Sequence, residues 1–172
     1  YHVYRGDYVY NAIKSGNWYP LYDPAWYNGV EILRYWSPFP AYVMAFCQYL
    51  AGGSQFGAYL FYIGGVCFLG ACVWPFIGRG FNRPYMGAFI GLLWFFMPNN
   101  LCAIFIEGNL ARSLSMIFLP VFIYSVYKYL YNHKLRYIPL MVFTFLLMEL
   151  CHLGYAGMVA IAVIIYGIVY MI

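Results

Sequence analysis

Residues 55–77 read QFGAYLFYIGGVCFLGACVWPFI, an apolar run that carries no charged side chain. A helix needs about 20 mostly apolar residues to cross the hydrocarbon core of a bilayer, so this run is long enough to span it. Only 8% of the 172 residues are charged and 65% are hydrophobic, whereas a soluble domain carries about 25% charged residues. We therefore predict an all-α fold, a polytopic transmembrane helical bundle that has lipid as its main solvent.

The first 54 residues differ from the rest of the chain. Residues 1–37 contain no spanning run and are rich in aromatic side chains and prolines. Residues 38–52 are apolar but short, and prolines and glycines flank them. We predict that residues 1–54 form an extracytoplasmic loop with short interfacial helices that lies on the membrane. For residues 38–52, a short tilted span is the alternative.

The membrane part is predicted to begin at residue 55. Transmembrane helices are expected at about 55–77, 85–105, 110–131, 137–152 and 155–172. The second of these is expected to break near Pro98, which removes a backbone donor, and the two asparagines that follow can supply replacement hydrogen bonds. The sequence begins at Tyr1 and stops inside an apolar run, so we expect a fragment of a longer chain.

Basic residues in short loops indicate which side of a membrane each loop faces, because Lys and Arg are enriched on the cytoplasmic side. Two predicted hairpins contain Arg79, Arg83, Lys128, Lys134 and Arg136 and no acidic residue. If these hairpins are cytoplasmic, all five carboxylates are extracytoplasmic: Asp7, Asp23, Glu31, Glu107 and Glu149. A functional site on that side accounts for this distribution. The alternative is that the outer loops are simply the longest polar segments.

Several functional classes are excluded by composition. The chain has no basic stripe and no interleaving of basic and aromatic residues, so nucleic-acid binding is not expected. Its five cysteines form no C-x-x-C pair, which argues against a zinc ribbon or a c-type haem. We interpret these cysteines as small buried apolar residues.

The chain opens with YHVYRGDY, which places His2, Arg5 and Asp7 at spacings of three and five from the first of them. These spacings allow the three to share part of a helical face. An Arg binds phosphate through paired N–H donors, and a His or Asp accepts a proton. The alternative is a solvated helix end with an incidental charge pair.

The motif EGNLAR contains a second candidate site, with Glu107 and Arg112. Asn109 is a predicted N-cap for a helix that begins at Leu110. The start of that helix attracts anions, and Arg112 in its first turns suits the phosphate of a lipid head group. The alternative is an Arg at the membrane interface that pairs with Glu107.

Two further patterns lie inside the apolar runs. Glu149 and His152 form E-x-x-H, a motif that builds di-metal sites when two copies are present. One copy is found here, so we expect no such metal site. His152 is instead a candidate for a cavity, or else a hydrated residue at the end of a span. Gly87-x-x-x-Gly91 predicts close packing between helices.

Four segments in this order resemble a known family: HVYRGDYVYNAIKSGNWYP, WYNGVEILRYWSPFPAYV, EGNLARSLSMIFLPVFIY and LLMELCHLG. They are similar to polytopic membrane proteins of the GT-C glycosyltransferase superfamily, and most of all to the group labelled 6-pyruvoyl-tetrahydropterin synthase-related. That label implies no pterin chemistry. The similarity runs through essentially the whole chain.

The resemblance implies a glycosyltransferase of a bacterial or archaeal plasma membrane that uses a polyprenyl-phosphate-linked sugar on the extracytoplasmic side. It implies catalytic roles for Asp7, Glu107 and His152, although the related proteins commonly have a further Asp ahead of the position of Tyr1. Substrate contacts are expected from His2, Arg5 and Arg112, with Trp18 and Trp26 as surfaces for sugar stacking. A D-x-D motif is absent, no metal ligand is assigned, and a divalent cation is left open as a cofactor.

Two other functions are consistent with the same sequence. One is a non-catalytic or transport protein that handles lipid-linked saccharide or polysaccharide on the same scaffold. The other is a structural membrane subunit that binds a partner protein. The cytoplasmic halves of the predicted spans are nearly free of ionisable groups, which argues against transport of a charged solute.

Overall fold

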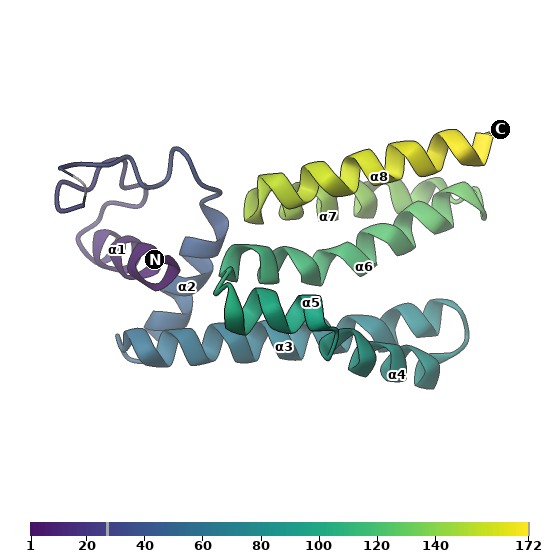
Figure 1. The fold of residues 1–172 in the computed structure, drawn as a ribbon, viewed down its shortest axis with the longest axis horizontal. Helices are drawn as coiled ribbons and strands as arrows, with labels where there is room; N and C mark the ends of the chain where they lie inside the picture. Colours follow the sequence, from purple (N-terminus) through teal and green to yellow (C-terminus); the bar gives the residue numbers. More distant parts are fainter. Residues whose placement is uncertain (27, 172) are drawn as a thin grey trace.

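The computed structural model describes residues 1–26 and 28–171, and this part of the chain is all-α, as predicted (Figure 1). Its α-helices are α1 (His2–Lys14), α2 (Phe39–Leu50), α3 (Gln55–Gly80), α4 (Pro84–Phe95), α5 (Pro98–Leu101), α6 (Leu110–Leu130), α7 (Ile138–Cys151) and α8 (Leu153–Met171). A π-helical turn, η1 (Cys102–Ile106), continues α5, and a 3-10 turn, η2 (Leu135–Tyr137), precedes α7. The connection between α1 and α2 contains one isolated antiparallel bridge, between Asp23 and Val30.

Within the described residues, three helices are long and apolar enough to cross a membrane: α3, α6 and Leu153–Tyr170 of α8. The α4 helix and the α5–η1 segment together are also long and apolar enough, but they meet at a bend of 53°. They make a fourth crossing if the two parts form one broken span. The predicted span at 137–152 corresponds to α7, which has 14 residues. A crossing needs about 20 residues, so a span at this position stays a prediction.

Asn100 stabilises the break between α4 and α5. The first helix ends at Phe95, and the second starts at Pro98, which has no backbone N–H to donate. The buried Asn100 side chain donates a hydrogen bond of 2.6 Å from Nδ2 to the carbonyl of Trp94. This bond is a replacement of the kind that the sequence predicts for the interrupted helix.

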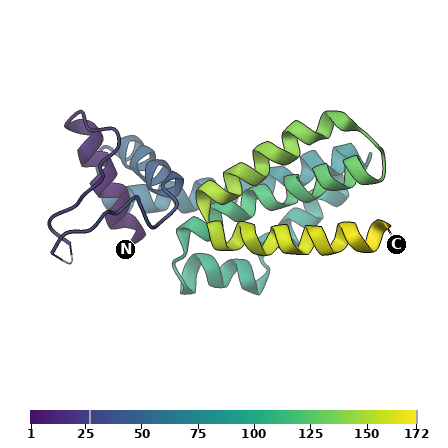
Figure 2. The same ribbon diagram turned by 90° about the horizontal axis from the view of Figure 1, so that it is seen from above.

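The helices form a bundle with a separate layer across one end. In the bundle, α3, α6, α7 and α8 run along the long axis of the molecule (Figure 1). Seen from above, α1 runs across that direction, and the α1–α2 connection lies beside it (Figure 2). We call α1, this connection and α2 the end layer. That this layer lies on the membrane surface stays a prediction.

A shared core fixes the end layer against the bundle. The Tyr62 hydroxyl of α3 is buried in it and donates a hydrogen bond of 2.7 Å to the carbonyl of Leu110, at the start of α6. The buried apolar residues of this core come from α2, α3, α6 and α7, and include Met44, Cys47, Ala58, Tyr62, Val66, Leu110, Leu114, Ile117 and Cys151. The start of α6 and the end of α7 are therefore held close to the end layer.

The Gly87-x-x-x-Gly91 spacing serves helix packing, as predicted. A Cβ atom added at Gly87 would lie 2.4 Å from the carbonyl oxygen of Trp74, and one added at Gly91 would lie 2.9 Å from the Trp74 Cβ. The backbones of α3 and α4 thus approach to a distance that leaves no room for a larger side chain.

The two ends of the bundle differ in charge in the way that the sequence predicts. The carboxylates Asp7, Asp23, Glu31, Glu107 and Glu149 all lie at the end that carries the end layer (Figure 1). The α3–α4 and α6–α7 connections form the opposite end, where the charged residues are Arg79, Arg83, Lys128, Lys134 and Arg136. We call this the basic end. That it faces the cytoplasm stays a prediction.

Candidate functional site

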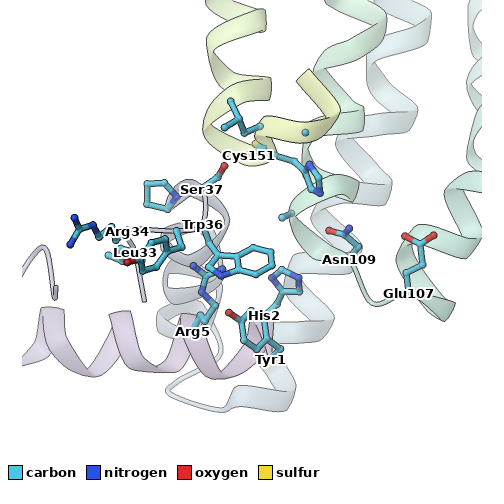
Figure 3. A pocket seen from close by; sticks show the side chains of 16 residues that line it. Tyr1, His2, Arg5, Leu33, Arg34, Trp36, Ser37, Glu107, Asn109 and Cys151 are labelled. Atoms are coloured by element: carbon cyan, nitrogen blue, oxygen red, sulfur yellow. The ribbon is translucent and has the colours of Figure 1, made fainter. Parts of the chain in front are cut away.

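A cavity of about 590 Å³ opens where the end layer meets the bundle (Figure 3). Its walls come from the start of α1, residues 33–38, the start of α6 and the α7–α8 junction. Figure 3 shows His2, Arg5 and Trp36 on one side of this space and Asn109 and Glu107 on the other. The cavity therefore brings together segments that lie far apart in the sequence.

Arg5 lines the cavity and is buried, with 3% of its surface exposed. Its Nη2 donates a hydrogen bond of 2.5 Å to the carbonyl of Ile32, and its guanidinium carbon lies 5.4 Å from the ring centres of Tyr1 and Trp36. Its Nε is buried without a partner, and no carboxylate of the described residues forms an ion pair with it. Burial lowers the pKa of Arg5. A buried cation without a counter-charge favours the binding of an anion.

The starts of two long helices also face this cavity. Ala111 of α6 and Leu153 and Gly154 of α8 line it. Their backbone N–H groups belong to the first helical turns, and within the described residues these groups have no hydrogen-bond partner. Unpaired N–H groups and the positive end of the helix dipole both attract negative charge. Together with Arg5, they make the cavity an anion-binding environment.

His152 is fixed in one tautomer by the start of α8. It is the single residue between α7 and α8 and has an extended backbone, with φ −156° and ψ 94°. Its Nδ1 accepts a hydrogen bond of 3.1 Å from the backbone N–H of Tyr155, which caps the helix. A ring nitrogen that accepts a hydrogen bond carries no proton, so the neutral imidazole is protonated on Nε2. The free ring nitrogen of His152 is thus an N–H donor rather than a base.

His2 lines the cavity from the first turn of α1 and is half-buried. Burial, and next the positive charge of Arg5, lower the pKa of His2 to about 4. Its imidazole is therefore uncharged at neutral pH and adds no positive charge to the cavity. An uncharged imidazole offers one N–H donor and one acceptor, so His2 can bind either the anion or a neighbouring hydroxyl.

Glu107 and Arg112 bind each other ahead of α6. The Arg112 Nη1 lies 3.1 Å from the Glu107 Oε2, and the Arg112 Nη2 donates a hydrogen bond of 2.7 Å to Oδ1 of Asn99. Glu107 lines the cavity, whereas Arg112 does not. The ion pair of the alternative interpretation is therefore formed, and a phosphate contact from Arg112 stays a prediction. The predicted N-cap is confirmed, because Asn109 Oδ1 accepts a hydrogen bond of 3.0 Å from the Arg112 backbone N–H.

Three more predicted site residues do not line the cavity. Asp7 lies two residues after Arg5, on a different face of α1, and its Oδ1 accepts a hydrogen bond of 2.7 Å from Gln48 of α2. Trp18 is 71% exposed in the α1–α2 connection. Trp26 packs against the ring of Tyr1 with a centroid distance of 4.7 Å. The predicted site residues that do line the cavity are His2, Arg5, Glu107 and His152.

Sequence reasoning missed the segment that closes the cavity from the side of the end layer. Trp36 lies beside Arg5, and Ser37 Oγ donates a hydrogen bond of 3.1 Å to the carbonyl of Glu149 in the last turn of α7. That bond joins residues 112 positions apart. The available signal was the run RYWSP, in which polar and aromatic residues precede an apolar helix.

The E-x-x-H pair does not act as one unit here, because Glu149 does not line the cavity with His152. Among the described residues, no group of three or more His, Cys, Asp or Glu side chains is placed to hold a metal ion. The divalent cation that the resemblance leaves open has no assigned ligands in this part of the chain.

Most of the chain matches a known protein family. Residues 33–172 match the 6-pyruvoyl-tetrahydropterin synthase related domain, which is described as a membrane protein. The matched range includes α2 to α8 and, with them, Glu107, Asn109 and His152 of the cavity; His2 and Arg5 precede it. A comparison with curated proteins found no match, and neither did one with solved structures. Since the match covers most of the chain, this is an integral membrane protein that belongs to the 6-pyruvoyl-tetrahydropterin synthase related domain family.

Proposed function

We propose that the protein is a membrane-embedded glycosyltransferase of GT-C type, and that it transfers a sugar from a polyprenyl-phosphate-linked donor on the side that carries residues 1–54. The observation that carries this proposal is Arg5, a buried cation without a carboxylate partner. It lines the cavity between the end layer and the bundle. A phosphate attached to a lipid reaches such a position while its chain stays in the bilayer.

The charge of the cavity supports a phosphodiester as ligand. Arg34 also lines it, but its Nη1 lies 2.6 Å from Glu31, and the charge of Glu107 is offset by Arg112. Arg5 is then the one cation among the described lining residues without a carboxylate partner. A sugar joined to a polyprenyl monophosphate has a single negative charge, which one guanidinium neutralises.

The same donors suit the leaving group of the transfer. The acceptor oxygen bonds to the anomeric carbon while the bond from that carbon to the phosphate oxygen breaks, and its electrons stay on the phosphate. The polyprenyl phosphate thereby gains a second negative charge. Arg5, the N–H groups of Ala111, Leu153 and Gly154, and Nε2–H of His152 are donors that stabilise developing charge of this kind.

Glu107 is the candidate base for the acceptor hydroxyl. It is the one carboxylate among the described residues that line the cavity. A general base must reach the acceptor proton directly or through one water. Glu107 is 41% exposed at its side chain and is held by Arg112, so accepting a proton would weaken that ion pair and free Arg112 to donate elsewhere.

The test is sugar transfer by the full-length protein in proteoliposomes, with a labelled polyprenyl-phosphate sugar as donor. Glu107→Gln should lower the transfer rate by about 10²–10⁴-fold, the usual contribution of a general base. Glu149→Gln is the matched control, because Glu149 lies at the same end of the bundle but does not line the cavity. Wild-type turnover by Glu107→Gln would refute this assignment of the base.

A second candidate function is binding or handling of lipid-linked saccharide without transfer. It is favoured by the ion pair between Glu107 and Arg112, which leaves the cavity without an uncommitted carboxylate. This function predicts that the wild-type protein is stabilised by a polyprenyl phosphate and that Arg5→Met loses this effect. It also predicts that no labelled sugar leaves the donor in the transfer assay.

A further inference from the structure

We propose that the basic end is a second binding site, and that it takes the phosphate-bearing head groups of anionic phospholipids from the surrounding membrane. Its exposed cations are Arg79, Arg83, Lys134 and Arg136. The site lies at the opposite end of the bundle from the cavity (Figure 1). It is thus independent of the proposed function.

Lys128 joins the two hairpins that carry these cations. This side chain of α6 is buried, and its Nζ donates a hydrogen bond of 2.9 Å to the carbonyl of Gly80, at the end of α3. The same Nζ lies 4.5 Å from the ring centre of Phe81, within the range of a cation–π contact. The α3–α4 connection is therefore fixed against the end of α6.

An aromatic cluster continues this junction to the next connection. The Phe81 ring packs edge-on against Tyr124 at a centroid distance of 5.6 Å, and Tyr124 packs edge-on against Tyr137 at 5.7 Å. Arg79 and Arg83 each lie two residues from Phe81, and Arg136 precedes Tyr137. The cluster thus joins the two hairpins that carry these three arginines, and the Arg136 guanidinium carbon lies 5.3 Å from the Tyr137 ring centre.

The charge of this patch has no internal compensation. None of the four exposed cations forms an ion pair with a carboxylate of the described residues, whereas Arg34 and Arg112 at the other end are both paired. Like charges repel one another within the Debye length of about 8 Å at physiological salt. An external anion that sits between them relieves this repulsion.

The position of the patch points to a lipid rather than a soluble anion. The cations flank the ends of α3 and α6, two helices that are long and apolar enough to cross the bilayer. Exposed aromatic side chains lie among them, with Tyr85 at 91% and Tyr131 at 47% of their surface, as is typical of residues at the depth of the head groups. Arg binds a phosphate through two parallel N–H donors, and basic pockets at helix ends recognise anionic head groups.

The test uses the full-length protein in nanodiscs made from equal parts of phosphatidylcholine and phosphatidylglycerol. Lipids that stay bound after mild extraction are counted by native mass spectrometry. Wild type should retain phosphatidylglycerol in preference to phosphatidylcholine. In the triple variant R79Q/R83Q/R136Q, the ratio of retained phosphatidylglycerol to phosphatidylcholine should fall by about 100-fold. This fall corresponds to about 1 kcal/mol for each cation near an anionic surface.

Two controls separate a lipid site from a folding defect. R79K/R83K/R136K keeps the charges and should keep most of the preference, even if glutamine at these positions impairs folding. K14Q removes an exposed cation of the end layer and should retain wild-type lipid binding. The proposal is overturned if wild type shows no preference for phosphatidylglycerol, or if the triple Gln variant keeps it. Loss of sugar transfer would bear only on the proposed function, since lipid retention is counted without it.

Discussion

Replacing Arg5 with Met tests whether the cavity binds an anion. The substitution removes the positive charge and the N–H donors but keeps a long side chain beside Tyr1 and Trp36. Arg5 is buried at 3% exposure, and Ile32 supplies its one hydrogen-bond acceptor among the described residues. A cation in that position is unfavourable in the empty cavity and favourable when an anion is bound. The substitution should therefore weaken anion binding much more than it changes the stability of the ligand-free protein.

The magnitudes follow from the contacts of Arg5. Loss of its hydrogen bond to Ile32 removes about 1.5–3 kcal/mol, the usual contribution of a bond to a charged group. Removal of its buried, unpartnered Nε relieves about 1–3 kcal/mol. These effects nearly cancel, so the free energy of unfolding of the ligand-free protein should change by less than about 1 kcal/mol. Loss of a charge-assisted bond to phosphate should weaken binding by about 10- to 150-fold.

Thermal unfolding of the full-length protein in nanodiscs, with and without a short-chain isoprenyl phosphate, measures both quantities. At a ligand concentration of 100 times the wild-type Kd, wild type gains about 2.7 kcal/mol. A variant that binds 100-fold more weakly gains about 0.4 kcal/mol at the same concentration. Lys14→Met is the matched control, since Lys14 is an exposed cation on the same helix.

Two results would refute this reasoning. The first is an unchanged ligand-induced stabilisation in Arg5→Met, which would mean that the phosphate binds elsewhere. The second is a loss of more than about 3 kcal/mol of stability in the ligand-free variant, a cost expected when a buried charge pair is broken. Arg5 would then be a structural residue with an acceptor other than Ile32.

Three further predictions concern single residues. His152→Ala should lose the hydrogen bond that caps Tyr155 and about 1 kcal/mol of stability. His152→Asn should keep the stability but bind an isoprenyl phosphate more weakly, because it lacks the Nε2–H donor. Thermal unfolding with and without ligand measures both effects. The pKa of His2 falls from 6.5 to about 4 on folding, so the unfolded chain binds more protons between these values, and the stability that neutral His2 contributes is lost as the pH falls from 6.5 toward 4. His2→Gln should flatten that part of the stability profile, measured by unfolding at a series of pH values. Gly87→Ala should destabilise the α3–α4 pair by about 1–3 kcal/mol, because its Cβ would lie 2.4 Å from the Trp74 carbonyl oxygen; thermal unfolding measures this loss.

Local signals were sufficient to predict most of the helices. The run at 55–77 became α3, with three more residues at its end, and the segment at 110–131 became α6. At both starts a side chain accepts a hydrogen bond from the backbone N–H three residues later. The accepting side chain is Ser54 in α3 and Asn109 in α6. Helix starts and breaks depend on residues within one turn, so a sequence reveals them.

The walls of the cavity depend on contacts that a sequence does not reveal. Arg5 binds the carbonyl of Ile32, and Ser37 binds that of Glu149. Backbone carbonyls leave no trace in the sequence, because every residue has one. Sequence reasoning therefore found Arg5 and Glu107 of the cavity but missed Arg34 and the segment around Trp36 that closes it.

Helical geometry explains why the cavity contains a cation and not its nearest carboxylate. Residues three apart on a helix lie on one face, whereas residues two apart do not. His2 and Arg5 therefore both line the cavity, while Asp7 faces α2 and binds Gln48. At the start of α6 the outcome is the opposite, because Glu107 lies before the helix and reaches Arg112 past a glycine in the left-handed conformation, Gly108 at φ +59°. One arginine thus keeps its charge available to a ligand and the other does not, and the difference arises from the spacing of each arginine from its nearest acid.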